Sequence, residues 1–190
     1  MSIANPSPYT LLRRYHDAMT AVVERYGGYV ANYLGDGILT YFGWPRADED
    51  QAAQAVRAGL AAVAAAKEMS LRVHVGIASG TVVVGDLEGA GHRQTGAIAG
   101  ETPNLAARLE ALAAPDQVVI SGLTRQLIGT AIASINPSPT ANRLGPTFIL
   151  TSAGYGGPPA TKCSLSPSRA FEQLPAMPRT LILEGSRSVV

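Results

Sequence analysis

Two short β-prone runs, Tyr29–Leu34 and Ile38–Phe42, are separated by the turn Gly35-Asp36-Gly37. Glycine adopts the positive φ angles that tight hairpin turns require, and Asp-Gly is a favoured pair in such turns. The pattern therefore predicts a β-hairpin with Asp36 at its tip. A carboxylate in that position can hold a divalent cation, although a plain turn residue is the simpler alternative for Asp36.

Apolar residues at helical spacing flank the hairpin on both sides. Before it, Ser7-Pro8 resembles the start of a helix, which Gly27-Gly28 ends. After it, the acidic run Asp48-Glu49-Asp50 predicts the first turn of a second helix, where the helix dipole favours negative charge. The expected buried stripes are Leu11, Tyr15, Met19, Val22 and Tyr26 in the first helix and Ala52, Ala55, Val56, Gly59, Leu60 and Val63 in the second.

Strand and helix patterns continue to about residue 130. We expect strands over Leu71–Ala78 and Thr81–Val84 joined at Ser79-Gly80, then a polar, glycine-rich excursion over Gly85–Gly96. A third helix is predicted from Thr102-Pro103, with Leu105, Leu109 and Leu112 facing the core. After it we expect a turn at Ala114–Asp116, a strand over Gln117–Ile120, and a short helix that is capped by Ser121 and ends near Ile128. This alternation indicates an α/β (α+β) sandwich, in which a mixed, mainly antiparallel sheet packs against helices.

Beyond Thr130 the pattern is lost. Eight of the 13 prolines lie there, and only Phe148–Leu150 and Leu181–Leu183 resemble strands. We therefore expect one domain over residues 7–130 and a poorly ordered tail, rich in Pro, Ser and Gly, over residues 131–190.

Composition excludes several classes of function. The net charge of +1 provides no basic surface for nucleic acid, and no apolar run approaches the ~20 residues of a membrane span. Cys163 is the only cysteine, which fits a reducing compartment. We expect a soluble, cytoplasmic protein that binds neither nucleic acid nor membrane.

Asn104 and Arg108 lie four residues apart in the third predicted helix, so their side chains share one face. An arginine fork pairs well with phosphate oxygens and stays charged. Together with the Asp36 carboxylate, this pair points to phosphoryl chemistry on a nucleotide. The alternative is that Arg108 is a surface partner of Glu101 or Glu110.

Several segments resemble the catalytic domain of class III adenylate/guanylate cyclases, in its bacterial form. They are Arg25–Pro45, Glu49–Arg57, Val75–Asp86 and Gly100–Glu110, within a similarity that runs from about Tyr9 to Leu127. The resemblance implies the ferredoxin-like class III cyclase fold. It also implies that this fold is incomplete here, because the family's first strand would precede Met1.

The resemblance further implies a reaction. Family members bind ATP or GTP with two divalent cations (Mg²⁺ or Mn²⁺), and the 3′-hydroxyl attacks the α-phosphate with release of pyrophosphate. In this sequence Asp36 corresponds to a metal ligand, and Gly35 and Gly37 flank it at the substrate. Asn104 corresponds to the residue that positions the ribose, and Arg108 to the one that stabilises the transition state. Because family sites are shared between subunits, a homodimer or a partner cyclase chain is implied.

The sequence departs from the family at three positions. The first metal aspartate is absent, and Asp17 lies on a predicted helix, so it is no substitute. The purine-reading positions are Asn32, where the family has Lys, and Ala97, which cannot hydrogen-bond a base through its side chain. We expect an adenylate cyclase that forms cyclic AMP from ATP; the alternative is an inactive cyclase-homology module that dimerises with a partner cyclase. We also expect that the chain starts inside the domain and that its reading frame shifts after about Gly129.

Overall fold

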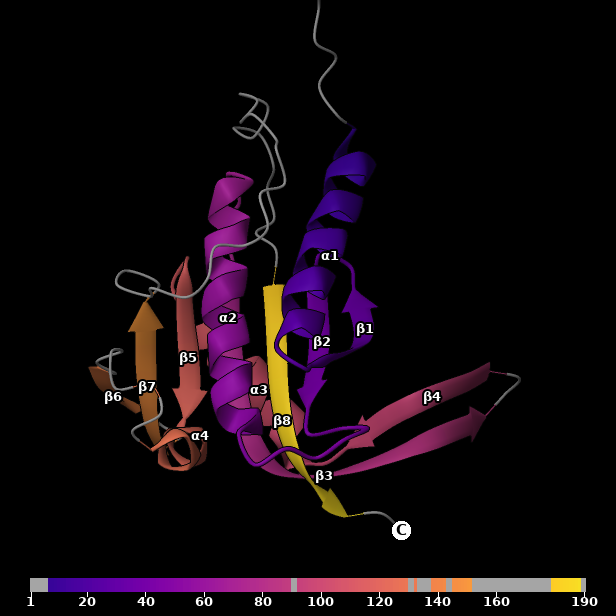
Figure 1. Ribbon diagram of the computed structural model, residues 1–190, viewed down its shortest axis with the longest axis vertical. Helices are drawn as coiled ribbons and strands as arrows, with labels where there is room; N and C mark the ends of the chain where they lie inside the picture. The colour runs from indigo at the N-terminus through magenta and orange to yellow at the C-terminus, as the bar shows by residue number, and fades with distance from the viewer. Residues whose placement is uncertain are drawn as a thin grey trace, which may run out of the picture.

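The computed structural model describes residues 7–89, 92–129, 132, 138–142, 145–151 and 179–188. Helices pack on both sides of one mixed sheet (Figure 1). In chain order the elements are α1 (Pro8–Arg25), β1 (Tyr29–Leu34), β2 (Gly37–Phe42), α2 (Gln51–Glu68), β3 (His74–Gly89), β4 (His92–Ala99), α3 (Glu101–Leu112), β5 (Gln117–Ser121), α4 (Gly122–Ile128), β6 (Ser138–Asn142), β7 (Gly145–Thr151) and β8 (Arg179–Ser188).

The ends of α1 follow the predicted signals. The Ser7 hydroxyl accepts a hydrogen bond from the Thr10 backbone N–H at 3.3 Å, and Pro8 occupies the first helical position. The helix ends at Arg25, and Gly27 has a φ of 77°, which favours glycine. Tyr15, Met19 and Val22 are buried as expected, so this amphipathic helix docks through the predicted stripe.

The start of α2 differs slightly from the prediction. The acidic run precedes the helix instead of forming its first turn, which begins at Gln51. The Asp48 carboxylate accepts hydrogen bonds from the Asp50 backbone N–H at 2.9 Å and from the Gln54 side-chain amide at 3.0 Å. Both bonds hold the pKa of Asp48 below its usual range. The predicted stripe of α2 is buried throughout.

The sheet has the strand order β1-β2-β8-β3-β5-β7-β6, and β4 pairs with β3. Strand β8 comes from the far end of the chain, yet it lies between β2 and β3 and runs parallel to both. The strand-like stretches Leu181–Leu183 and Phe148–Leu150 lie within β8 and β7. The resemblance implies a sheet without the family's first strand; in this structure, β8 from the far end of the chain is the strand that pairs with the inner side of β2. Much of the predicted tail, residues 152–178, lies outside the described residues, and the domain boundary near residue 130 stays a prediction.

The predicted turn at Ser79-Gly80 is wrong. Strand β3 continues through both residues, which pair with Glu184 and Gly185 of β8. The glycine serves close packing instead, because a Cβ on Gly80 would lie 2.4 Å from the Thr102 hydroxyl oxygen. Of the predicted Gly85–Gly96 excursion, Gly85–Gly89 and His92–Gly96 form the outer part of the paired strands β3 and β4, which project from the body of the molecule (Figure 1).

Each face of the sheet has its own core. Helices α1 and α2 cover one face, where the largest buried side chains include Ile38, Phe42 and Ile77. Helix α3 covers the other, where Tyr41, Ala78 and Leu109 are buried. Burial on both faces explains why the central strands read as nearly continuous apolar runs.

One predicted core position of α3 is wrong. Leu109 is fully buried, but Leu112 is 49% exposed and Glu110 is buried. The helix approaches β3 through Ala106 and the backbone of Glu110, so its last residue lies away from the contact.

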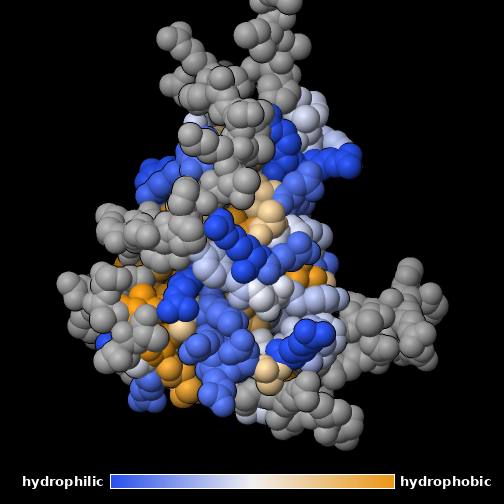
Figure 2. All heavy atoms as spheres, in the orientation of Figure 1, coloured by the Kyte–Doolittle hydropathy of each residue, from blue (hydrophilic) through white to orange (hydrophobic). Residues whose placement is uncertain are grey.

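The outward surface of α1 and α2 is mostly hydrophilic, with an apolar area over β7 and α4 at the lower left of Figure 2. Leu123 and Leu127 of α4 are 47% and 57% exposed. Among the described residues, no helix combines the length and the apolar character that crossing a membrane requires.

Candidate active site

Helix α3 is seated directly on β3, and this contact fixes the positions of Asn104 and Arg108. A Cβ on Gly76 would lie 2.3 Å from both the Ala106 carbonyl oxygen and the Glu110 backbone nitrogen, so the helix backbone rests on a glycine. At the start of the helix, the Thr102 hydroxyl donates a hydrogen bond to the Thr81 carbonyl oxygen at 3.2 Å. The sequence pattern missed the role of Gly76, although a glycine inside a strand is a known sign of close backbone approach.

Asn104 and Arg108 are exposed on α3, one turn apart, as predicted. The suggestion that Glu110 is a surface partner of Arg108 does not hold, because Glu110 is buried and lies two residues away, on a different side of the helix. The two side chains can therefore present an amide and a guanidinium together to a solvent-borne ligand.

The β1–β2 hairpin is confirmed. Leu34 pairs with Gly37 across a two-residue turn in which Gly35 has a φ of 68° and Asp36 does not have a positive φ. This is the pattern of a type II′ turn. A Cβ on Gly35 would meet nothing within 4 Å, so the tip projects from the body with Asp36 partly exposed.

Strand register places Asp36 far from the helical pair within one chain. Ile38 lies level with Val75, because both pair with Thr180. Asp36 is two residues beyond Ile38, toward the hairpin tip. Asn104 lies in the opposite direction along the strands, because α3 crosses β3 from the level of Gly76 to that of Gly80. At ~3.3 Å per residue and ~4.8 Å per strand, the separation is on the order of 15–20 Å. A single nucleotide phosphate cannot contact both groups in one chain.

The two predicted purine-reading positions lie on different elements. Asn32 follows a β-bulge in β1 and pairs with Leu39, which packs in the core beneath α3. This register places Asn32 on the α3 side of the sheet. Ala97 lies on β4 opposite Gly85 of β3, and its side chain is outside the described residues.

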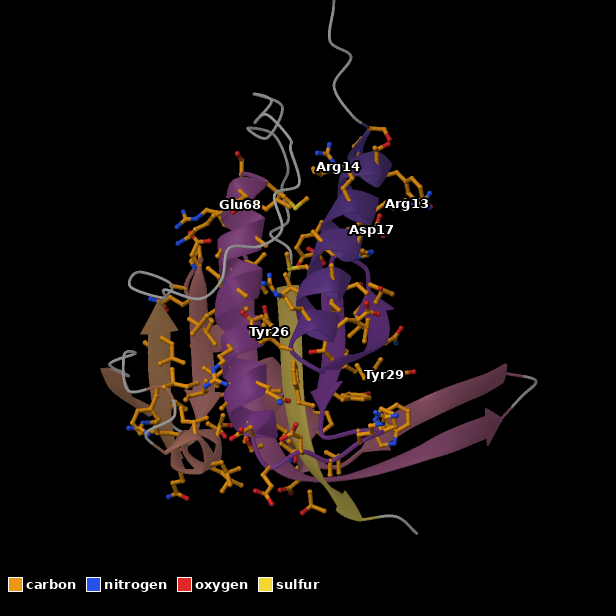
Figure 3. The ribbon with its side chains drawn as sticks, in the orientation of Figure 1. Arg13, Arg14, Asp17, Tyr26, Tyr29 and Glu68 are labelled. Atoms are coloured by element: carbon orange, nitrogen blue, oxygen red, sulfur yellow. The ribbon has the colours of Figure 1, made fainter. Side chains whose placement is uncertain are left out.

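Of the two metal aspartates of the family, this sequence has only the one that corresponds to Asp36, and the described residues offer no larger ligand cluster. In that part of the chain there is no cluster of three or more His, Cys, Asp or Glu side chains suited to a metal. The described residue of β8 closest in register to the hairpin tip is Arg179, and Asp17 lies exposed on α1 (Figure 3). Asp36 alone fits one Mg²⁺ or Mn²⁺ whose other ligands are phosphate oxygens and water.

An aromatic cluster lies beside α3, formed by Tyr29, Tyr41 and Trp44. The Tyr29 ring lies 6.4 Å from that of Tyr41 and 4.7 Å from that of Trp44, measured between centroids. Burial of Tyr41 and the neighbouring Tyr29 raise the pKa of Tyr41 from 10.0 to about 12. The cluster thus favours the neutral phenol of Tyr41.

This pKa predicts a loss of stability in alkali. The folded chain holds the Tyr41 proton more tightly than the unfolded chain. The protonated phenol therefore contributes to the free energy of unfolding in full below pH 10, and this contribution disappears as the pH rises through about 12. At roughly 1.4 kcal/mol per pKa unit, it amounts to about 3 kcal/mol. Urea unfolding at pH 9 and pH 11.5 should show a smaller drop for Tyr41→Phe than for wild type. Equal drops would contradict the assignment.

Comparison with known proteins supports this architecture. Residues 5–140 match the family model described as adenylate and guanylate cyclase catalytic domain. An uncharacterised protein of Rhizobium meliloti (strain 1021), R02095, is 32% identical over 133 residues. That alignment covers 66% of this chain but 13% of the relative, so the chain spans about an eighth of that protein's length.

Two solved structures share the fold. The guanylyl cyclase Cya2 matches with a TM-score of 0.63 and 25% identity, over 87% of this chain and 88% of that one. The adenylyl cyclase CyaB from P. aeruginosa matches with a TM-score of 0.62 and 18% identity, over the same shares, 87% and 88%. One is named a guanylyl cyclase and the other an adenylyl cyclase, so the shared fold does not identify the nucleotide base. With more than half of its length matched by the family model, this chain belongs to the class III adenylate and guanylate cyclase catalytic domains.

Proposed function

We propose that the domain forms cyclic AMP and pyrophosphate from ATP, at a site shared between two copies of the chain. The observation that supports this proposal is the separation of Asp36 from Asn104 and Arg108 within one chain, on the order of 15–20 Å by register. Both groups are at least partly exposed. A second copy can therefore bring its α3 to the hairpin tip of the first.

The residues then divide the chemistry between the two copies. The ribose 3′-oxygen attacks the α-phosphorus and gives its proton to solvent water, while the bond from that phosphorus to the pyrophosphate oxygen breaks and pyrophosphate leaves. Arg108 donates hydrogen bonds to the α-phosphate oxygens as charge develops there, which favours the transition state over the bound substrate. Asn104 positions the ribose. A divalent cation on Asp36 and the phosphates supplies charge neutralisation when bound.

For the base, Asn32 both donates and accepts hydrogen bonds, so it accommodates an adenine edge or a guanine edge. We propose ATP as the substrate, with GTP as the competing nucleotide to be assayed beside it. We also propose a cytoplasmic location, which the single cysteine and the nucleotide substrate fit.

A second candidate function is favoured by a specific observation: among the described residues, no cluster of three or more His, Cys, Asp or Glu side chains could hold a metal ion. In this case the chain dimerises with a partner cyclase that has both aspartates. It contributes Asn104 and Arg108 to an active site whose metal-binding aspartates belong to the partner, and it has no activity alone.

The two candidates differ in one assay of the purified full chain with ATP and excess Mn²⁺. The shared homodimer site predicts cyclic AMP formation that Asp36→Ala lowers by about 100-fold or more, the range seen when a group that stabilises the transition state is removed. The matched control, Asp17→Ala, removes an exposed carboxylate from α1 and should leave the rate unchanged.

A folded chain that forms no cyclic AMP would reject the proposal of an active site shared in a homodimer. The chain should then be mixed with a class III cyclase whose own helical arginine is replaced by alanine. Cyclic AMP formation by the mixture that depends on Arg108 supports the second candidate function. A mixture that forms no cyclic AMP rejects that function as well.

A further inference from the structure

The hairpin that carries Asp36 has little to hold it at its tip. Strand β1 is at the edge of the sheet, so β2 is its only strand neighbour in the described sheet. Leu34 is 55% exposed, and a Cβ on Gly35 would meet nothing within 4 Å. A hairpin held on one side only is free to tilt about its paired edge unless a side chain anchors it.

Tyr33 provides such an anchor. It pairs with Ile38, which is buried under α1 and α2, and so Tyr33 lies on the α1 side of the hairpin. Its hydroxyl and that of Thr20 in α1 are hydrogen-bonded at 2.7 Å. Tyr33 is 46% exposed and only three residues from Asp36, so this bond ties the tip, rather than the base of the hairpin, to the helix.

His16 completes the contact one turn earlier in α1. Its ring lies 4.6 Å from that of Tyr33 and 5.7 Å from that of Tyr15, measured between centroids, and both pairs are tilted. The buried Nε2 atom of His16 has no hydrogen-bond partner among the described residues. The imidazole is therefore held by ring packing, and it fixes the direction of the Tyr33 ring rather than bonding the hydroxyl.

We propose that Thr20, His16 and Tyr33 form a clamp by which α1 sets the position of Asp36, with Tyr33 as a positioning residue for the reaction. The inference rests on the proposed function, because it concerns the placement of the Asp36 carboxylate at the substrate. The clamp acts through the backbone of residues 33–36. Loosening it spreads Asp36 over several positions and weakens the hold on a cation and its phosphates, without removing any ligand.

The first test is amide hydrogen exchange of the metal-free full chain. Tyr33→Phe keeps the ring contact with His16 and removes only the hydroxyl. It should speed exchange at Leu34 and Gly37 by about two- to tenfold, the range expected for one lost hydrogen bond. The melting temperature should fall by no more than a few °C, because a single bond of this kind contributes only about 0.5–1.5 kcal/mol. Tyr29→Phe is the matched control on the same strand, away from the tip, and should leave the tip amides at wild-type rates.

A double-mutant cycle identifies the bonding partner. Thr20→Val should reproduce the effect of Tyr33→Phe, and the double variant should add nothing further, because both changes remove the same bond. Unchanged exchange at Leu34 and Gly37 in either single variant, or fully additive effects, would overturn the clamp.

Kinetics give a second readout. In the active protein, Tyr33→Phe should raise the Mn²⁺ concentration for half-maximal rate by severalfold and leave kcat at saturating Mn²⁺ near wild type. A purely structural contact would instead lower kcat together with the melting temperature, and that result would reject the positioning role. If the wild-type chain makes no cyclic AMP, the homodimer proposal fails, while the exchange experiment still decides on the clamp.

Discussion

Gly76→Ala is expected to destabilise the protein by about 3 kcal/mol and to impair cyclase activity further. The added methyl group would lie 2.3 Å from the Ala106 carbonyl oxygen and the Glu110 nitrogen. Both are backbone atoms inside a helix, so no side-chain rotation relieves the clash, and α3 has to move away from β3. Overpacking of this kind reaches the upper end of the usual 1–3 kcal/mol range. Because α3 carries Asn104 and Arg108, its displacement also misplaces the pair that we propose to be catalytic.

Thermal unfolding checks this expectation, with Gly59→Ala as the matched control. A Cβ on Gly59 would meet the ends of the Ile77 and Val75 side chains at 3.2 Å, and these can shift. Alanine also favours the interior of α2 by about 1 kcal/mol over glycine. We therefore expect a drop in melting temperature of about 10 °C for Gly76→Ala and little change for Gly59→Ala. Similar melting temperatures for both variants would show that α3 is not seated on Gly76.

Local sequence signals predicted the elements that depend on local chemistry. The β1–β2 hairpin follows from a glycine with positive φ at Gly35 and from β-prone runs on either side. The N-terminal ends of α1 and α4 follow from Ser7 and Ser121, because the hydroxyl of each accepts a hydrogen bond from a backbone N–H of the first turn. In each case the residues that decide the structure lie within a few positions of one another.

Non-local packing was not predictable in the same way. Leu181–Leu183 resembles a strand, but nothing in its composition indicates insertion between β2 and β3, whose paired residues are more than 100 positions away. Gly80 was read as a turn because glycine marks turns and close contacts alike, and only the position of Thr102 distinguishes them. Pairing and close approach across the chain depend on tertiary structure, which periodicity does not report.

The candidate site was predictable in its parts and not in its assembly. Helical spacing placed Asn104 and Arg108 on one face, and the turn placed Asp36 at a tip, as the structure has them. Their separation within a chain follows only from the register of β2, β8 and β3. The roles of these residues came from the family resemblance, because an exposed arginine in a helix carries no chemistry by its position alone.

Arg108→Ala is expected to lower kcat by about 100- to 1000-fold, the effect of removing one donor aimed at developing charge. The melting temperature should stay at the wild-type value, since Arg108 is exposed on α3. Arg108→Lys should recover only part of the rate, because an ammonium keeps the charge but lacks the planar fork of the guanidinium. Cyclic AMP formation at saturating ATP measures both effects. A rate for Arg108→Ala near that of wild type would exclude a role in the transition state.

Mixing the variants tests whether the site is shared. Asp36→Ala and Arg108→Ala are each nearly inactive alone in the homodimer proposal, but a mixed dimer has one site with an intact Asp36 and an intact Arg108. Random pairing of equal amounts makes half of the dimers mixed, with one of two symmetric sites intact, so about a quarter of the wild-type rate should return. Asp36→Ala mixed with the Asp36→Ala/Arg108→Ala double variant is the control, because no pairing of these chains restores a site. Recovery in the control, or none in the test mixture, would contradict a site built from the hairpin tip of one chain and α3 of another.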